Sequence, residues 1–322
     1  MLKVAVIGVG AFGHEHARVY SEVEASHVAF ICDVDESRGR PIAERYRADF
    51  VTDYHELIGK VDAASVAVTT ESHAKIASEL LKAGIAVLVE KPIARTIQEA
   101  DTIIEASRQS GSVLQVGHLE RFNPAVMAAS RITTQPRFFE AHRLSVFTPR
   151  SLDIDVVMDL MIHDLDVLLS LVKSEVTEVR AAGVPILTPK IDIANARIEF
   201  ANGCVANLTA SRVSAERVRK LRFFQPGEYV SIDYAVQEAA VVSVKPRPKG
   251  RPEFESRLLT VERSEPLRLE IESFLSAVQG APVKVTGEDG RRALELAIDV
   301  TERIREHAAK AGVSLTSEGD QA

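Results

Sequence analysis

Apolar and polar positions divide the first 118 residues into alternating short and long segments. Short apolar runs occupy residues 2–7, 28–32, 64–68, 86–89 and 113–116, and segments with helical spacing occupy 11–23, 36–46, 73–83 and 97–109. Runs without polar alternation predict strands buried on both faces, which is typical of a parallel sheet covered by helices. We therefore expect residues 1–118 to form a doubly wound α/β domain.

The pattern changes after residue 118. One helical segment, 157–171, precedes segments of alternating polarity at 195–200, 204–211, 221–225 and 229–244. Alternation is typical of antiparallel strands with one covered and one open face. We expect residues 119–322 to form a substrate-binding α+β domain with a large, mostly antiparallel open sheet, whose open face would support a homodimer or homotetramer. Near the C-terminus, Thr286 and Asp289 predict the capped start of a docking helix.

Composition and charge then limit the class of protein. Hydrophobic residues make up 46% and charged residues 26%, which is ordinary for soluble globular domains, and no apolar run approaches the ~20 residues that span a bilayer. The formal net charge of −7 disfavours a nucleic-acid partner, because phosphate binding needs a basic face. Cys32 and Cys204 are too few for a disulfide framework. Because the start also lacks a signal-peptide pattern, we expect a cytoplasmic protein that acts on a small molecule.

A glycine-rich turn follows the first apolar run. Gly8, Gly10 and Gly13 match G-x-G-x-x-G between a predicted strand and a predicted helix, which is the Rossmann dinucleotide fingerprint. The glycines permit a tight turn, close approach of a pyrophosphate, and close packing of helix on strand. Asp33, 20 residues beyond Gly13, ends the next strand and could bind the adenosine ribose. Because its charge would repel a 2′-phosphate, the motif predicts NAD, while the nearby Arg38 leaves NADP as the alternative.

Two further positions carry side chains suited to catalysis. Lys91 follows the fourth predicted strand, at the edge where open α/β sheets bind ligands, and its ammonium could stabilise a developing alkoxide. Helical spacing places Asp159, His163 and Asp166 on one face, where His163 could accept a proton and Asp159 could orient it. The alternatives are a solvated lysine, a structural histidine, or a metal site. No second histidine or cysteine lies close to His163 in sequence, so we expect no metal.

Together these motifs resemble the Gfo/Idh/MocA family, named for glucose-fructose oxidoreductase, inositol dehydrogenase and rhizopine catabolism. The resemblance rests on segments 8–13, 70–73 and 90–92, together with Asp33, Asp159 and His163. The resemblance implies that Lys91, Asp159 and His163 carry an NAD-dependent oxidation of a sugar hydroxyl. It implies cofactor contacts by Gly8, Gly10, Ala11, Phe12, Gly13, Asp33, Thr69, Thr70, His73, Glu90 and Lys91. Thr69 departs from the proline that the family often has at this position.

Within this family, segments 116–124 and 149–155 resemble the UDP-N-acetylglucosamine 3-dehydrogenases. That resemblance implies oxidation of the sugar 3-hydroxyl, followed by an aminotransferase reaction for lipid A synthesis. Arg121 and Arg150 would bind the diphosphate, because guanidinium groups bind phosphate oxygens in pairs, or they would form surface salt bridges. Asn123 would bind a sugar hydroxyl or cap the turn at Pro124. His163 would also contact the substrate.

Three other functions stay open from the sequence. An inositol or simple-sugar dehydrogenase would use the same Lys91 and His163. A non-catalytic, NAD-responsive binding protein could share the fold. Metal-dependent hydrolysis at Asp159 and His163 would be lost with a chelator.

Overall fold

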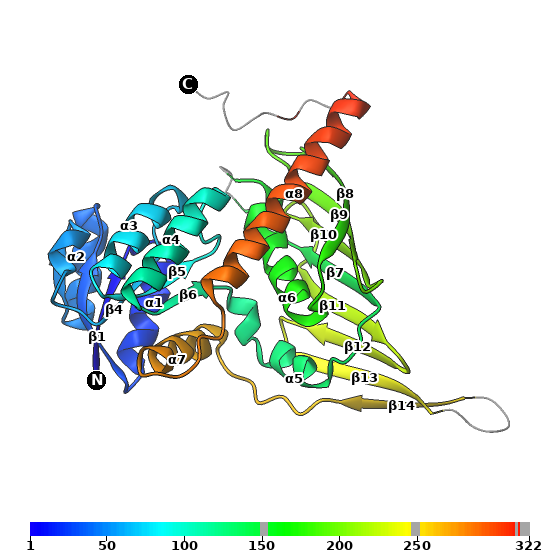
Figure 1. Ribbon diagram of the computed structural model, residues 1–322, viewed down its shortest axis with the longest axis horizontal. Helices are drawn as coiled ribbons and strands as arrows, with labels where there is room; N and C mark the ends of the chain where they lie inside the picture. The colour runs from blue at the N-terminus through cyan, green and yellow to red at the C-terminus, as the bar shows by residue number, and fades with distance from the viewer. Residues whose placement is uncertain (149–153, 246–251, 313–314, 316–322) are drawn as a thin grey trace. The chain divides into compact units, whose positions relative to one another are not determined.

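A computed structural model describes residues 1–148, 154–245, 252–312 and 315 of the chain (Figure 1). Contacts between residues divide the chain into two compact units. Unit 1 comprises Met1–Phe122 and Ser264–Leu294, and unit 2 comprises the described residues of Asn123–Arg263 and Glu295–Ala322. None of the helices in the described part of the chain has the length and apolarity that a membrane crossing requires.

Unit 1 contains a six-stranded parallel sheet in the order β3-β2-β1-β4-β5-β6. The strands are β1 (Leu2–Ile7), β2 (Ser26–Cys32), β3 (Asp49–Val51), β4 (Ala63–Val66), β5 (Ala86–Glu90) and β6 (Leu114–Gly117). Every residue of β4, β5 and β6 is buried, as continuous apolar runs predict for strands covered on both faces. The predicted doubly wound Rossmann sheet is confirmed. The short edge strand β3 was not predicted.

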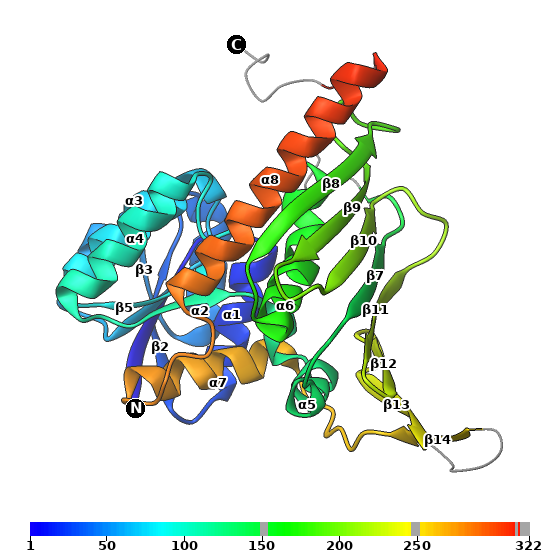
Figure 2. The same ribbon diagram turned by 45° about the vertical axis from the view of Figure 1, so that its right-hand side comes forward.

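Helices cover both faces of this sheet (Figure 2). They are α1 (Ala11–Glu22), α2 (Glu36–Tyr46), α3 (Thr70–Lys82), α4 (Ile97–Ser110) and α7 (Pro266–Val278), with short 3₁₀ turns η1 (Tyr54–Leu57) and η2 (Leu119–Phe122). Contacts group α1 with α2 and α7, and α3 with α4. The late helix α7 completes the core, because Ile271 and Phe274 join Tyr20 of α1 in one buried cluster. Helix α7 was not predicted.

Unit 2 contains an eight-stranded sheet in the order β14-β13-β12-β11-β7-β10-β9-β8. The strands are β7 (Phe138–Leu144), β8 (Val176–Val184), β9 (Ile193–Phe200), β10 (Val205–Ser211), β11 (Val218–Gln225), β12 (Glu228–Asp233), β13 (Glu238–Lys245) and β14 (Glu253–Leu258). Only the pairing of β7 with β10 is parallel among the described strand pairs of this sheet. The predicted, mostly antiparallel sheet is therefore confirmed.

The helical segments of unit 2 are α5 (Pro124–Ile132), the π-helical turn η3 (Val157–Met161), α6 (Ile162–Val172) and most of α8 (Gly287–Ala311), which begins in unit 1. They lie along one face of the sheet (Figure 1). Neighbouring side chains on a strand point to opposite faces. Accordingly, Phe223 is buried whereas 40% of Phe224 is exposed. The sheet thus has a covered face and an open face.

The predicted strand 229–244 is wrong as a single strand, because β12 and β13 are separate strands joined by a turn at 234–237. This turn contains neither glycine nor proline, and Gln237 takes the left-handed conformation instead, with φ of 53°. The sequence signal that remains is Asp233, whose Oδ1 accepts from the N–H groups of Ala235 and Val236. The predicted capped start of α8 is confirmed, since the Asp289 N–H donates to Thr286 Oγ1 at 3.1 Å.

Candidate functional site

The glycine-rich turn after β1 has the backbone geometry that a dinucleotide requires. Gly8 has φ of +81°, and a Cβ added there would lie 2.7 Å from Val68 Cγ1. A Cβ added at Gly13 would lie 1.8 Å from the Gly8 carbonyl oxygen, so helix and turn are in direct contact. At Gly10, in contrast, an added Cβ would meet no described atom within 4 Å. The N-terminus of α1 has no side-chain cap, and its N–H groups therefore suit an anionic ligand.

Asp33 directly follows β2 and accepts four hydrogen bonds. Its Oδ2 accepts from Val9 N at 2.8 Å and Arg38 Nε at 3.1 Å. Its Oδ1 accepts from Asp35 N at 2.9 Å and Arg38 Nη2 at 2.8 Å. Burial raises the pKa of Asp33, but these hydrogen bonds and the charge of Arg38 outweigh it and hold the pKa below its ordinary value. The carboxylate is therefore ionised, with Arg38 as its ion-pair partner.

Lys91 lies at the carboxyl edge of the sheet, immediately after β5. Glu90 of β5 pairs in register with Gly117 of β6, so the residues that follow both strands emerge at the same edge. Lys91 is half-buried, and its backbone N–H donates to Glu90 Oε2 at 3.2 Å. The ring of the buried His73 lies between two carbonyl oxygens, 3.0 Å from that of Pro92 and 3.2 Å from that of Val68. His73 therefore ties α3 to the segment that carries Lys91.

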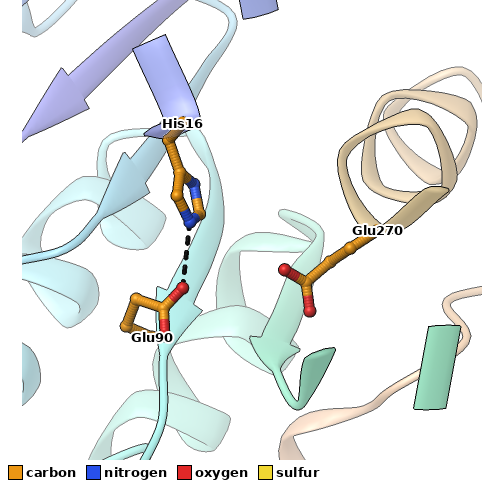
Figure 3. A group of neighbouring side chains, drawn as sticks. All are labelled: His16, Glu90 and Glu270. Atoms are coloured by element: carbon orange, nitrogen blue, oxygen red, sulfur yellow. Dashed lines mark hydrogen bonds and ion pairs between the residues drawn. The ribbon is translucent and has the colours of Figure 1, made fainter. Parts of the chain in front are cut away.

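A buried polar cluster adjoins Glu90 (Figure 3). His16 of α1 places Nε2 2.9 Å from Glu90 Oε1 and Nδ1 3.0 Å from Ser65 Oγ. Glu270 of α7 adds a second carboxylate, and one ligand atom of each of His16, Glu90 and Glu270 lies within 4.8 Å of the others. Burial raises the pKa of Glu90, but the hydrogen bond from His16 and the positive charge of Lys91 hold the pKa below its ordinary value. The sequence did not single out His16 or Glu270.

His118, the first residue after β6, was not assigned a role from the sequence. Both its ring nitrogens are buried, and neither has a hydrogen-bond partner among the described residues. Burial, together with the positive charges of Arg121 and Lys91, lowers the pKa of His118 to about 3. The ring is therefore neutral at physiological pH.

Asp159 and His163 lie in unit 2, where both are half-buried. Asp159 belongs to η3, in which the Ile162 N–H bonds to the Val157 carbonyl, the i→i+5 bond of a π turn. The prediction of a regular α-helix over 157–171 is therefore wrong in this turn. A π turn changes the angular offset between residues before and after it, so the spacing that placed Asp159 with His163 does not hold as stated.

A local cap lies at the start of the π turn, and an ion pair with another element lies beyond its end. At its start, Asp155 Oδ1 accepts from the N–H groups of Val157 and Met158, at 2.9 and 3.0 Å. Beyond its end, Asp164 forms a buried, bidentate ion pair with Arg143 of β7. Arg143 Nε donates to Asp164 Oδ2 at 2.7 Å, and Arg143 Nη2 donates to Asp164 Oδ1 at 3.0 Å. The π turn therefore lies between a local cap and a buried ion pair with β7.

Three further residues, Asn123, Arg121 and Arg150, were predicted to bind the substrate. Asn123 caps α5 by accepting from Ala125 N at 3.1 Å and donates to the Tyr234 carbonyl at 3.1 Å, so of its two predicted roles the cap is present. Arg121 lies in η2, where its Nη2 is 3.5 Å from the Lys284 carbonyl oxygen. Arg150 lies outside the described residues.

Comparison with known proteins finds similarity along nearly the whole chain. Residues 2–118 match the model of an oxidoreductase family with an NAD-binding Rossmann fold, and residues 128–225 match that of the GFO/IDH/MocA C-terminal domain. The UDP-N-acetylglucosamine 3-dehydrogenase of Acidithiobacillus ferrooxidans is 37% identical over 305 residues, which cover 93% of this chain and 96% of the relative.

Two further comparisons extend this result. A solved structure of the Acidithiobacillus ferrooxidans enzyme superimposes with a TM-score of 0.89 at 36% identity, covering 95% of this chain and 98% of that one. The myo-inositol 2-dehydrogenase of Thermotoga maritima is 26% identical over 328 residues, covering 95% of this chain and 97% of the relative. Both units therefore have counterparts in dehydrogenases of known name.

Proposed function

This chain belongs to the Gfo/Idh/MocA oxidoreductase family, and we propose that it oxidises the 3-hydroxyl of UDP-N-acetylglucosamine to a ketone with NAD as hydride acceptor. The observation that carries the proposal is the 37% identity, over 93% of the chain, to an enzyme of that name. Alignment over this length includes residues of both units. The more distant inositol dehydrogenase supports the same type of reaction on another hydroxyl-bearing substrate.

The residues of unit 1 fit NAD. The open side of Gly10 and the uncapped start of α1 suit its pyrophosphate, and the ionised Asp33 suits the adenosine ribose and disfavours a 2′-phosphate. When bound, NAD supplies the acceptor for the hydride. The cofactor contacts that we propose are Gly8, Gly10, Ala11, Phe12, Gly13, Asp33, Thr69, Thr70, His73, Glu90 and Lys91.

The proposed chemistry uses the side chains of Lys91, His163 and Asp159. The Lys91 ammonium donates a hydrogen bond to the sugar hydroxyl and stabilises the charge that develops on its oxygen as the hydride leaves the carbon. A ring nitrogen of His163 accepts the hydroxyl proton, so that the C–H and O–H bonds break while the C=O bond forms. Asp159 orients His163 or binds a neighbouring hydroxyl. Arg121 and Arg150 bind the diphosphate, and Asn123 holds the start of α5.

The test compares substrates with one preparation of the protein. Formation of reduced nicotinamide is followed by absorbance after addition of UDP-N-acetylglucosamine, N-acetylglucosamine or myo-inositol, and the product is examined by NMR. We expect kcat/KM for the nucleotide sugar to be at least about tenfold higher than for the others, a difference of ~1.4 kcal/mol, and the ketone to be at carbon 3. Turnover of myo-inositol without turnover of the nucleotide sugar would contradict the proposal.

We also propose that the enzyme is cytoplasmic and acts before an aminotransferase in lipid A synthesis. For its assembly we propose a homodimer or homotetramer formed through the open face of the unit 2 sheet. Phe224 supports this assembly because it is an apolar side chain, 40% exposed, in the middle of the sheet order on β11. Replacing Phe224 by Glu should lower the mass measured by light scattering, whereas an unchanged mass would exclude this face as the interface.

A further inference from the structure

We propose that His16 is a positioning residue that acts through Glu90 to fix the backbone of Lys91. This inference rests on the proposed role of Lys91 in the oxidation. His16 and Lys91 are far apart in sequence, and Glu90 is the side chain that connects them. The sugar and the cofactor are not touched by His16 in this proposal, so its effect on the reaction is indirect.

A continuous series of hydrogen bonds leads to Glu90. The Tyr20 hydroxyl lies 2.9 Å from Ser65 Oγ, which lies 3.0 Å from His16 Nδ1. Burial raises the pKa of Tyr20, so its hydroxyl keeps its proton and can donate to Ser65. Ser65 then donates to Nδ1, and Nε2–H donates to Glu90 Oε1 at 2.9 Å. We assign the ring proton of His16 to Nε2, and with this assignment each hydroxyl and ring N–H of the series donates in the direction of Glu90.

The carboxylate of Glu90 links this series to the chain at Lys91. While Oε1 accepts from His16, Oε2 accepts from the Lys91 N–H at 3.2 Å. Space for the carboxylate depends on Gly117 of the neighbouring strand, because a Cβ added there would lie 3.1 Å from Glu90 Oε1. Only 12% of the Glu90 side chain and none of the His16 side chain is exposed, so water competes little for these bonds.

Glu270 makes the orientation of His16 more important. Two carboxyl groups lie close to one imidazole in a mostly buried region, where two like charges would repel strongly. Without His16, the Glu90 carboxylate would lose a hydrogen bond that favours its charged form and would no longer be held where it accepts from the Lys91 N–H. His16 thus opposes a displacement of the backbone that carries the proposed catalytic amine.

The same three side chains are donor types that a divalent metal ion accepts. Two observations favour hydrogen bonds of His16 over coordination of a metal ion by this cluster. The Nε2 to Oε1 distance of 2.9 Å is that of a direct hydrogen bond, and the second ring nitrogen is already occupied by Ser65. The hydrogen bonds of His16 are therefore complete without an ion, and binding of a metal becomes one outcome of the test.

The test compares three histidine variants of the full chain. His16→Leu removes both hydrogen bonds, whereas His16→Gln keeps a side-chain N–H that can reach Glu90. The matched control is His55→Leu, since each ring nitrogen of His55 also bonds a side chain, here the carboxylates of Asp53 and Glu79, but the ring is half exposed in η1. We expect kcat to fall about 10²-fold in His16→Leu with KM within about twofold of wild type, because a misplacement of ~1 Å costs about that much. His16→Gln should recover most of kcat, and His55→Leu should match wild type.

A second measurement does not depend on turnover. Hydrogen–deuterium exchange of the Lys91 amide should be about tenfold faster in His16→Leu than in wild type and in His16→Gln. A wild-type protein that oxidises no nucleotide sugar would refute the proposed function, yet the exchange of the Lys91 amide would still test the network. Wild-type kcat and wild-type exchange in His16→Leu would refute the inference alone.

Two further outcomes also overturn it. Equal losses of kcat in His16→Leu and His16→Gln, together with equal losses in Tm, would show that His16 only supports folding. Recovery of chelator-treated wild-type protein by Zn²⁺ or Mn²⁺, with one equivalent bound by elemental analysis, would show that the cluster is a metal site.

Discussion

The polar side chains at the carboxyl edge of unit 1 and those at the start of α6 in unit 2 are held in place by different means. In unit 1, Asp33 accepts four hydrogen bonds, and Glu90 is bonded to His16 and to the Lys91 N–H. These geometries are set by networks of side chains with backbone N–H groups. In unit 2, Asp159 lies within a π turn that begins at a cap by Asp155 and is followed by the ion pair of Asp164 with Arg143 of β7.

This difference separates two ways of orienting a functional group. A side-chain network fixes a charged group directly, and its loss should change charge and chemistry more than folding. A backbone irregularity fixes a group through the course of the chain, and loss of its anchors should change folding first. The predictions below follow from this contrast.

The largest effect is expected from the proposed catalytic groups themselves. Lys91→Ala should lower kcat by about 10²–10⁴-fold, because the charge that develops on the sugar oxygen loses its stabilising donor. His163→Ala, in unit 2, should give a loss of similar size, while the dissociation constant for NAD, measured by fluorescence titration, stays within about twofold of wild type. Lys82→Ala, at the exposed end of α3, serves as control. Wild-type turnover in Lys91→Ala would remove the basis of the proposed mechanism.

The buried ion pair of unit 2 should have the largest effect on folding. Arg143→Ala leaves Asp164 charged and without its two-pronged partner, which should lower the free energy of unfolding by about 3–5 kcal/mol in urea titrations. Arg197→Ala is the matched control, because its pair with Glu199 is exposed on the same sheet and should contribute less than about 1 kcal/mol. Similar losses in both variants would show that the π turn does not depend on this anchor.

Asp33 provides a pH test of the network in unit 1. Its folded pKa lies below the ordinary value of 3.8, so its ionised form stabilises the fold above the unfolded pKa. That contribution is lost as the pH falls below about 4 and through the folded pKa. The free energy of unfolding of Asp33→Asn should therefore fall less than that of wild type over this pH range. At neutral pH, the same variant should bind NAD about tenfold more weakly, a loss of ~1.4 kcal/mol in binding free energy. An unchanged pH profile in Asp33→Asn would contradict the network.

Features with a local sequence signal could be predicted, whereas features that depend on contacts between distant residues could not. All strands of unit 1 except the short β3, and the glycine turn, were predicted because continuous apolar runs and a fixed glycine spacing are local signals. The π turn was not predicted, because the ion pair of Asp164 beyond its end is made with Arg143 of another element and is seen only in the tertiary structure. The association of His16, Glu90 and Glu270 was also missed, since α1, β5 and α7 meet only on folding.

Several elements of the chain have weak local signals. Strand β8 was not predicted because its burial does not alternate, so its sequence shows no period of two. Strand β14 is exposed at every residue and therefore needs no apolar positions. Asn123 had a correct local signal, an asparagine before Pro124, but the pattern fits a cap and a ligand contact equally well. The hydrogen bond from Ala125 N shows the cap, and the ligand contact stays a prediction.

The smallest effect is expected at the other anchor of the π turn. Asp155→Ala removes the acceptor for the N–H groups of Val157 and Met158 and should lower the free energy of unfolding by about 1 kcal/mol, as loss of a helix cap does. Asp155→Asn keeps an acceptor oxygen and should lose less. Urea titration of both variants measures this difference, and hydrogen exchange of the Val157 and Met158 amides localises it. Because Asp155 and Asp164 hold opposite ends of one turn, the losses in Asp155→Ala and Arg143→Ala should not add in the double variant. Simple additivity would mean that the two anchors act on separate structures and that the π turn is not held between them.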